Sequence, residues 1–283
     1  MEPSTMTTDL KSRLRPVYAA VFERSPTARM LYLLATPKTR RSTEFVREGY
    51  KDAWSAYQAR LDATPSLDEW LCIRGFDDAP STHIFQGKMR YSGFDTNRYW
   101  IDEIEHTIRD SFPGAKSITE YGCGVGRNLL ALKKRFPEMA CYGYELADAG
   151  VAVARNAATK FGVDVSYAQL DYVKDPPAKY THPVTDLALT VFSLEQIPHV
   201  SPVAVKNMLD HSERGTIHVE PVSENYKKDY LGVLGRLYSR RVDFLQNFDH
   251  GVRALPVREV HARVLESSHN PLIPNPSVYA LIK

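Results

Sequence analysis

The stretch ITEYGCGVGRN, residues 118–128, decides the fold of this chain. A short β-prone run ends at Glu120, and three glycines follow it at Gly122, Gly124 and Gly126. A helix-forming run begins directly after them, so the stretch predicts a strand, a tight turn and a helix. Glycine lets a backbone bend sharply and approach a ligand closely, and the amide groups that open a helix favour polar ligand groups. We therefore expect a ligand site at this turn.

The spacing of the glycines discriminates between ligands. A dinucleotide-binding turn has its third glycine five residues after the first, and Arg127 stands at that position here. A phosphate-binding loop ends in Gly-Lys followed by Ser or Thr, and that ending is absent. The acid beside the loop, Glu120, suits an ammonium group better than a pyrophosphate. The alternative interpretation is an ordinary glycine-rich turn without a ligand.

Composition sets limits on the class of protein. The chain has 283 residues, of which 43% are hydrophobic and 25% charged, and this suits one large domain or one domain with an addition. A net charge of +2 is too small to indicate a nucleic-acid partner. The three cysteines, Cys72, Cys123 and Cys141, have no metal-ligand spacing and indicate a reducing compartment. The first fifteen residues do not resemble a secretory signal, and no apolar run is long enough to span a bilayer. We expect a cytoplasmic protein without a membrane partner, and the oligomeric state stays open.

Residues 1–115 are predicted to be mostly helical, with helices at 14–24, 42–61 and 95–111 and a loop at 77–82. Their aromatic residues are more often core than ligand contacts, because aromatic side chains dominate buried area. Tyr99 and Trp100 are candidate substrate contacts, since they lie just upstream of the first predicted strand. We expect this helical N-terminal region to cover the substrate site.

From residue 116 onward, predicted strands and helices alternate. The strands are expected at 117–120, 139–145, 163–170, 186–192 and 216–220, and the helices at 127–136, 148–161 and 202–209. This alternation predicts an α/β fold, in which helices cover both faces of a Rossmann-like, doubly wound, mostly parallel sheet.

Acidic residues follow successive predicted strands, at the edge where such sheets bind ligands. Glu145 ends the second strand and could accept hydrogen bonds from both hydroxyls of a ribose. Asp171 follows the third strand and could accept from an adenine amino group, with Leu170 and Tyr172 beside the ring. Each acid alone is more often a solvated residue, but a glycine loop with two such acids is much harder to obtain by accident.

Residues 116–221, and less specifically the tail to 283, resemble the small-molecule branch of the class I S-adenosylmethionine-dependent methyltransferases. The segment DLALTVFSLEQIP, residues 186–198, is similar to the family's fourth-strand segment. That branch often has histidine at this position. Because Gln196 stands here instead, a role that needs a titrating imidazole at this position is not expected. Residues 257–266 and 278–282 resemble the hairpin with which the family completes a seven-stranded sheet whose last strand is antiparallel. The resemblance implies S-adenosylmethionine as the cofactor.

The resemblance and the acids together give a set of candidate site residues. Cofactor-binding residues are expected to be Glu120, Gly122, Gly124, Gly126, Asn128, Glu145, Leu146, Asp171, Tyr172 and Phe192. Substrate contacts are expected at Tyr99, Trp100, Ser193 and Tyr226, and catalytic roles at Glu220, Glu195 and Gln196. We favour Glu220 over Glu195 as the residue that orients the acceptor or takes its proton, because a strand end is held more rigidly than a loop.

Residues 223–255 are too long for a plain crossover helix, so an added helical segment is expected between the fifth and sixth strands. Arg236, Arg240 and Arg241 in it are more often a solvated face than a site for an acidic substrate. The histidines His182, His199, His211, His218 and His250 are scattered without ligand spacing, so no metal is expected. The predicted reaction is in-line methyl transfer to an oxygen or nitrogen of a small or medium-sized metabolite. Alternatives are a peptide or protein acceptor, an NAD(P)-dependent oxidoreductase, or a non-catalytic cofactor-binding partner protein.

Overall fold

The computed structural model describes residues 25–34, 41–73, 81–92, 97–197, 201–268 and 270–283. The helix expected at 14–24 lies outside these residues. The helices predicted at 42–61 and 95–111 are α3 (Thr43–Ala63) and α5 (Asn97–Ser111). The amino terminus of α3 is fixed by Ser42, whose side chain accepts a hydrogen bond from the Phe45 N–H at 3.2 Å.

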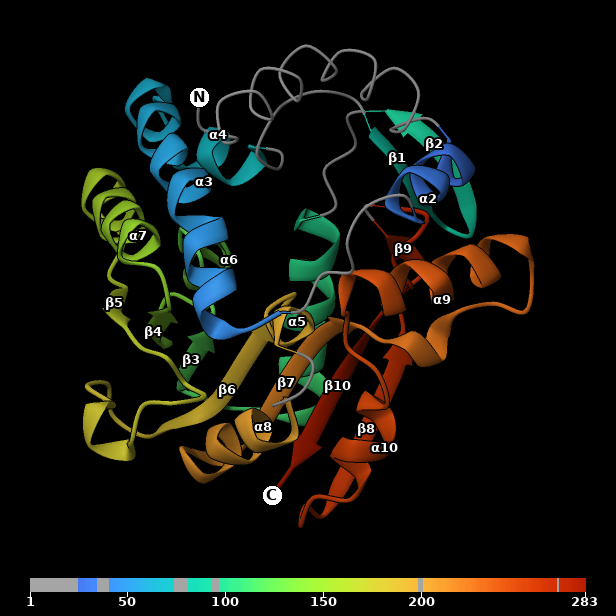
Figure 1. Ribbon diagram of the computed structural model, residues 1–283. Coiled ribbons are helices and arrows are strands. Elements are labelled where there is room, and N and C mark those ends of the chain that lie inside the picture. Colours follow the sequence, from blue (N-terminus) through green and yellow to red (C-terminus); the bar gives the residue numbers. More distant parts are fainter. Residues whose placement is uncertain (1–24, 35–40, 74–80, 93–96, 198–200, 269) are drawn as a thin grey trace.

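A seven-stranded sheet forms the centre of the molecule (Figure 1). In spatial order its strands are β5 (Ser166–Gln169), β4 (Ala140–Glu145), β3 (Ser117–Tyr121), β6 (Thr185–Val191), β7 (Ser212–Pro221), β10 (Pro276–Ile282) and β8 (Glu259–Val264). The first five pair in parallel, and β10 runs antiparallel to both of its neighbours. The predicted mostly parallel sheet with an antiparallel last strand is therefore confirmed.

Two hydrophobic cores lie on opposite faces of this sheet, because successive side chains of a strand point to opposite sides. On one face Leu187 and Leu189 of β6 belong to the same core as residues of α5, α6 (Arg127–Arg135) and α7 (Asp148–Phe161). On the other face Ala188 packs with residues of α8 (Ser201–Asp210) and α10 (Phe248–Arg253). Helices thus cover both faces, as expected for strands buried on both sides.

The N-terminal region also contains a hairpin that the sequence interpretation missed. Strands β1 (Ser81–Phe85) and β2 (Lys88–Ser92) are joined by Gln86 and Gly87, whose φ angles are 50° and 70°. Such a two-residue turn matches the natural twist of paired strands. The loop expected at 77–82 was wrong at its last two residues, which belong to β1. Strand β2 is exposed throughout, and although its five residues alternate polar and apolar side chains, so short a run without a buried face is a weak signal for a strand.

Four more described elements, three helices and one short strand, lie around the main sheet. Helix α2 (Pro26–Leu34) packs against α9 (Tyr230–Val242), which lies in the long segment after β7. Helix α4 (Leu67–Cys72) follows α3 and contacts α6, and β9 (Ser267–Ser268) pairs with β1. Figure 1 shows α9 and α10 beside β10 and β8, and α3 beside α7 at the other side of the sheet.

Candidate active site

The parallel strands end at one edge of the sheet and bring the candidate acids there. Glu120 of β3 lies opposite Gly143 of β4 and Leu189 of β6 in the register. Glu145 is the last residue of β4, and Glu220 lies near the end of β7. All three side chains are buried. Buried carboxylates are rare unless they are paired, so this edge is chemically unusual.

The three glycines of the loop have different reasons to be glycine. All have positive φ angles, which other residues rarely adopt. A Cβ on Gly122 would overlap the Ser193 side chain, and one on Gly126 would lie 2.5 Å from the Tyr167 hydroxyl oxygen. Both positions are therefore required by packing within the sheet and its loops. A Cβ on Gly124 would instead meet the indole of Trp54, a residue of α3. Of the three glycines, Gly124 is therefore the one that faces α3.

Glu120 lies completely buried beneath this loop. One of its oxygens, Oε1, accepts a hydrogen bond of 2.7 Å from Asn128 Nδ2. The other, Oε2, has no hydrogen-bond partner among the described residues. Burial raises the pKa of Glu120 to about 8, against the lowering effect of Asn128. An ammonium group at this point would satisfy the unpartnered oxygen and favour the charged carboxylate.

Glu145 is tied to the backbone on both sides of the cleft. Its Oε2 accepts the N–H of Gly124 at 2.9 Å, and its Oε1 accepts the N–H of Ala147 at 3.0 Å. Burial raises its pKa, while these hydrogen bonds oppose the rise. Each carboxylate oxygen has a second lone pair, so the group can still accept from a diol. Leu146, the next residue, is half-buried and its carbonyl accepts from Gln169.

Asp171 and Tyr172 lie after β5 at the same edge. Asp171 Oδ1 accepts the backbone N–H of Val173 at 3.2 Å and of Lys174 at 3.1 Å, so it shapes the turn that follows the strand. The hydroxyl of Tyr172 lies 2.7 Å from Ser193 Oγ. Ser193, predicted as a substrate contact, therefore lies against Gly122 and Tyr172 on the cofactor side of the edge.

Phe192 directly follows β6 and has a strained backbone conformation. Its φ is 52°, a region that side chains other than glycine rarely adopt, and strain of this kind gathers at functional sites. Its ring centroid lies 4.3 Å from that of Trp100 on α5. This pair brings one predicted substrate contact to the edge of the sheet.

The carboxylate of Glu220 is occupied by the loop that follows β6. Its Oε1 accepts the N–H groups of Ser193 and Leu194, each at 3.1 Å, and its Oε2 accepts that of Glu195 at 3.2 Å. Burial raises its pKa to about 7, and its hydrogen bonds, including one with the Thr190 side chain, oppose the rise. A carboxylate with this many donors positions the loop, and it is poorly placed to take a proton from an acceptor.

Glu195, a buried acid of the same loop, has one carboxylate oxygen that accepts no hydrogen bond from the described residues. Its Oε1 accepts from Gln196 Nε2 at 2.7 Å, whereas Oε2 has no hydrogen-bond partner among the described residues. Burial, and then the nearby charge of Glu220, raises its pKa to about 8. Gln196 in turn accepts from Arg41, which also donates from Nε to the carbonyl of Val242 at 2.9 Å. Of these two acids, Glu195 is the one with an oxygen that no described group bonds, whereas both oxygens of Glu220 accept backbone N–H groups.

Tyr99 and Tyr226, the two other predicted substrate contacts, have partners outside the edge of the sheet where the acids lie. Tyr99 packs edge to face on Phe85 of the hairpin, with 6.0 Å between ring centroids. The hydroxyl of Tyr226 lies 2.7 Å from Ser239 Oγ and donates to the carbonyl of Leu272 at 2.9 Å. These contacts give Tyr226 a structural role within the segment that follows β7.

Sequence reasoning missed a buried histidine behind the site. His218 lies between two threonine hydroxyls, with Nδ1 2.9 Å from Thr190 Oγ1 and Nε2 2.7 Å from Thr216 Oγ1. Burial lowers its pKa to about 3, so the imidazole is neutral. Through Thr190 this ring supports Glu220. The alternation of Thr216, His218 and Glu220 on one face of β7 was the available signal.

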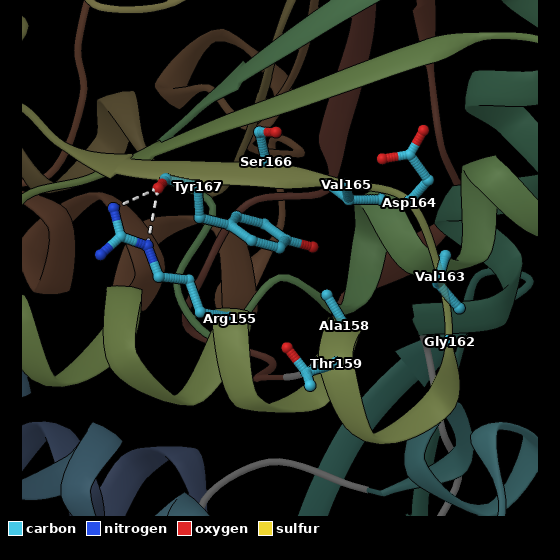
Figure 2. Close-up of a pocket in the computed structure, with 9 residues that line it drawn as sticks. All are labelled: Arg155, Ala158, Thr159, Gly162, Val163, Asp164, Val165, Ser166 and Tyr167. Atoms are coloured by element: carbon cyan, nitrogen blue, oxygen red, sulfur yellow. Dashed lines mark hydrogen bonds between the residues drawn. The ribbon is translucent and has the colours of Figure 1, made fainter.

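A hollow away from this edge is not part of the site. Figure 2 shows it between α7 and β5, with Arg155 donating to the carbonyl of Tyr167 at 2.9 and 2.6 Å. It is lined by residues 162–166, which lead into the amino end of β5. The described residues hold no His, Cys, Asp or Glu cluster suited to a metal, and none of their helices has the length and apolar character to cross a bilayer.

Comparison with known proteins identifies the fold. No family model and no curated protein matches the sequence. An O-methyltransferase family protein from Burkholderia thailandensis matches with a TM-score of 0.52 at 11% identity, over 65% of this chain and 55% of that one. Magnesium protoporphyrin IX methyltransferase from Synechocystis, solved with S-adenosylhomocysteine, matches with a TM-score of 0.48 at 14% identity, over 66% and 83%. This chain therefore spans about half the length of the first of these proteins. The chain has the class I methyltransferase fold.

Proposed function

We propose that this chain is an S-adenosylmethionine-dependent methyltransferase that methylates an oxygen or nitrogen of a small or medium-sized metabolite. The observation that carries the proposal is the pair of buried carboxylates beside Gly124. Glu120 has an unpartnered oxygen suited to an ammonium group, and Glu145 has the lone pairs suited to a ribose diol. S-adenosylmethionine carries both groups.

We call the ends of β3, β4 and β5 the cofactor half of the site. Its residues are Glu120, the glycine loop, Asn128, Glu145, Leu146, Asp171 and Tyr172. Bound there, the cofactor supplies a methyl group on a sulfonium, which is already a good leaving group. The chain's own task is then to align the acceptor and exclude water.

We call the ends of β6 and β7, with the loop after β6, the acceptor half. Its residues are Phe192, Glu195, Gln196 and Glu220, with Trp100 beside them. Glu220 positions the loop, and Glu195 is the group that takes a proton from an acceptor hydroxyl or ammonium. Its raised pKa, about 8, suits a base that works near neutral pH.

Binding measurements separate this proposal from its alternatives. Calorimetry should show binding of S-adenosylhomocysteine and none of nicotinamide dinucleotides, because Arg127 replaces the third glycine of a dinucleotide loop. A metabolite extract incubated with isotope-labelled methyl donor, followed by mass analysis, should then reveal a labelled small molecule. A labelled peptide or protein instead would identify the alternative acceptor class. Binding of a nicotinamide dinucleotide alone would overturn the proposal.

A further inference from the structure

The amino-terminal half of α3 lies over the cofactor half of the site. Arg47 faces Asp171, with 3.9 Å between Nη2 and Oδ2. One turn earlier in the helix, Glu44 pairs with Lys174, which follows Asp171. The helix therefore covers the end of β5 through two ion pairs, at the point where an adenine ring is expected.

Trp54 of the same helix fills the space in front of the glycine loop. A Cβ on Gly124 would lie 3.0 Å from Cζ2 of the indole, and one on Gly150 would lie 3.0 Å from its Cδ1. The indole also interacts with Glu145 and opposes the rise of its pKa. Gly124 and Glu145 are the residues that the proposed cofactor would contact, so the indole and the cofactor compete for one place.

Tyr50, one helical turn before Trp54, packs on the indole that fills the space in front of the glycine loop. Its ring stacks on Trp54, with 5.2 Å between centroids and 22° between planes. Burial raises its pKa to about 12, followed by the charge of Glu195. Through this stacking Tyr50 packs against the indole and supports its position in front of the glycine loop.

The two halves of α3 are held very differently. In the carboxyl half, Tyr57 and Leu61 are fully buried in the core, and Lys160 donates to the carbonyl of Leu61 at 2.6 Å. In the amino part that carries Trp54, residues 43–54, Thr43 is the only buried side chain, and Tyr50 and Trp54 are half-buried. The Glu44–Lys174 pair is largely exposed and contributes little, while Arg47 is half-exposed over the buried Asp171. Arg41, two residues before the helix, also bonds to Gln196 and to the carbonyl of Val242. Polar contacts therefore hold the amino part of the helix, whereas the hydrophobic core holds its carboxyl part.

We infer that α3 is a self-occluding lid: Trp54, with Tyr50 and Arg47, occupies the cofactor cleft, and the amino half of the helix must leave before the cofactor binds. This inference rests on the proposed function. A chain that binds ligand only when open has its apparent affinity reduced by the fraction that is open. Residues that hold the lid closed therefore oppose binding, although they lie against the site.

Removal of the indole is the direct test. Trp54→Ala should bind S-adenosylhomocysteine about tenfold more tightly than the unaltered chain, since a larger fraction is open. Lys51→Ala, an exposed position on the same helix, is the matched control and should leave affinity unchanged. Calorimetry gives the affinities, and circular dichroism verifies that both variants fold. Equal or weaker binding by folded Trp54→Ala would overturn the lid.

A cross-link separates failure of the lid from failure of the cofactor. In a Cys72→Ser background, which removes the exposed thiol, Glu44→Cys and Lys174→Cys can be joined by a short bis-maleimide. The bridged protein should not bind S-adenosylhomocysteine, whereas the same variant without the bridge should bind it. Binding by both forms would overturn the lid alone. Binding by neither form, nor by the unaltered chain, would overturn the proposed cofactor and the lid with it.

Discussion

The cofactor half and the acceptor half are built in contrasting ways. The cofactor half draws on a short continuous part of the chain, residues 120–172, in which each strand end is followed at once by a loop or helix. The acceptor half depends on Arg41, on the loop after β6 and on Glu220, which are far apart in the sequence. A local motif can hold one fixed cofactor, whereas remote contacts let the same fold hold different acceptors. Substitutions should therefore separate binding from turnover according to the half in which they lie.

The largest expected effect is in the glycine loop. Gly124→Val should weaken binding of S-adenosylhomocysteine at least about a hundredfold, or ~2.7 kcal/mol, because the side chain would enter the cleft at a φ of 55°. Calorimetry measures the loss, and circular dichroism should show an intact sheet. Gly126→Ala is the contrasting variant, since it meets Tyr167 and should lower the melting temperature instead. If Gly124→Val binds S-adenosylhomocysteine normally, the loop is a structural turn and does not contact the cofactor.

The acid at the end of β4 should have the next largest effect. Glu145→Ala should weaken the affinity for S-adenosylhomocysteine by about 1.5–3 kcal/mol, the range for hydrogen bonds to a charged group. Asp148→Ala, an exposed acid three residues later, is the control and should change affinity little. Calorimetry on both purified variants measures their affinities for S-adenosylhomocysteine. If the two bind alike, Glu145 does not belong to the site.

Binding should also depend on pH through Glu120. Its pKa in the folded chain is about 8, against 4.5 for the ordinary side chain. The proton on Glu120 stabilises the fold at low pH, and this stability is lost as the pH rises through 8. An ammonium group needs the ionised carboxylate, so affinity should rise up to about tenfold from pH 6 to pH 7. Titrations at both pH values test this, and Glu120→Gln should flatten the profile. A flat profile in the unaltered chain would contradict the role.

The smallest effect tests the acceptor half. Glu220→Gln should lower turnover about tenfold, ~1.4 kcal/mol in the barrier, because an amide cannot accept all three N–H groups of the loop. Affinity for S-adenosylhomocysteine should stay the same. Kinetics across pH on the identified acceptor then distinguish two roles. The Glu220 variant should keep the rise in turnover toward pH 8, and Glu195→Gln should abolish it. If turnover of Glu220→Gln no longer rises toward pH 8, Glu220 and not Glu195 takes the proton from the acceptor.

The sequence predicts the sheet well because its signals are local. Alternating strands and helices, the glycine turn and the acids at strand ends follow from neighbouring residues, and the strand positions agree with the structure to within a few residues. The hydrogen bonds that Glu220 accepts could not be predicted, because their donors belong to another strand's loop. The covering position of Trp54 was also beyond the sequence: its helical spacing is the same whether it meets a core or a cleft. The hairpin β1–β2 was missed because its second strand is short and exposed throughout, so no buried face marks it in the sequence.

The position of Ser193 has a consequence for how the two ligands bind. Its side chain lies against Gly122 and bonds to Tyr172, while its backbone N–H is held by Glu220. One residue therefore contacts both halves of the site. Thermodynamic linkage is reciprocal, so whatever factor the cofactor adds to acceptor affinity, the acceptor must return to cofactor affinity. The order in which the two ligands arrive is then a matter of kinetics, and the affinity of the ternary complex is the same by either route.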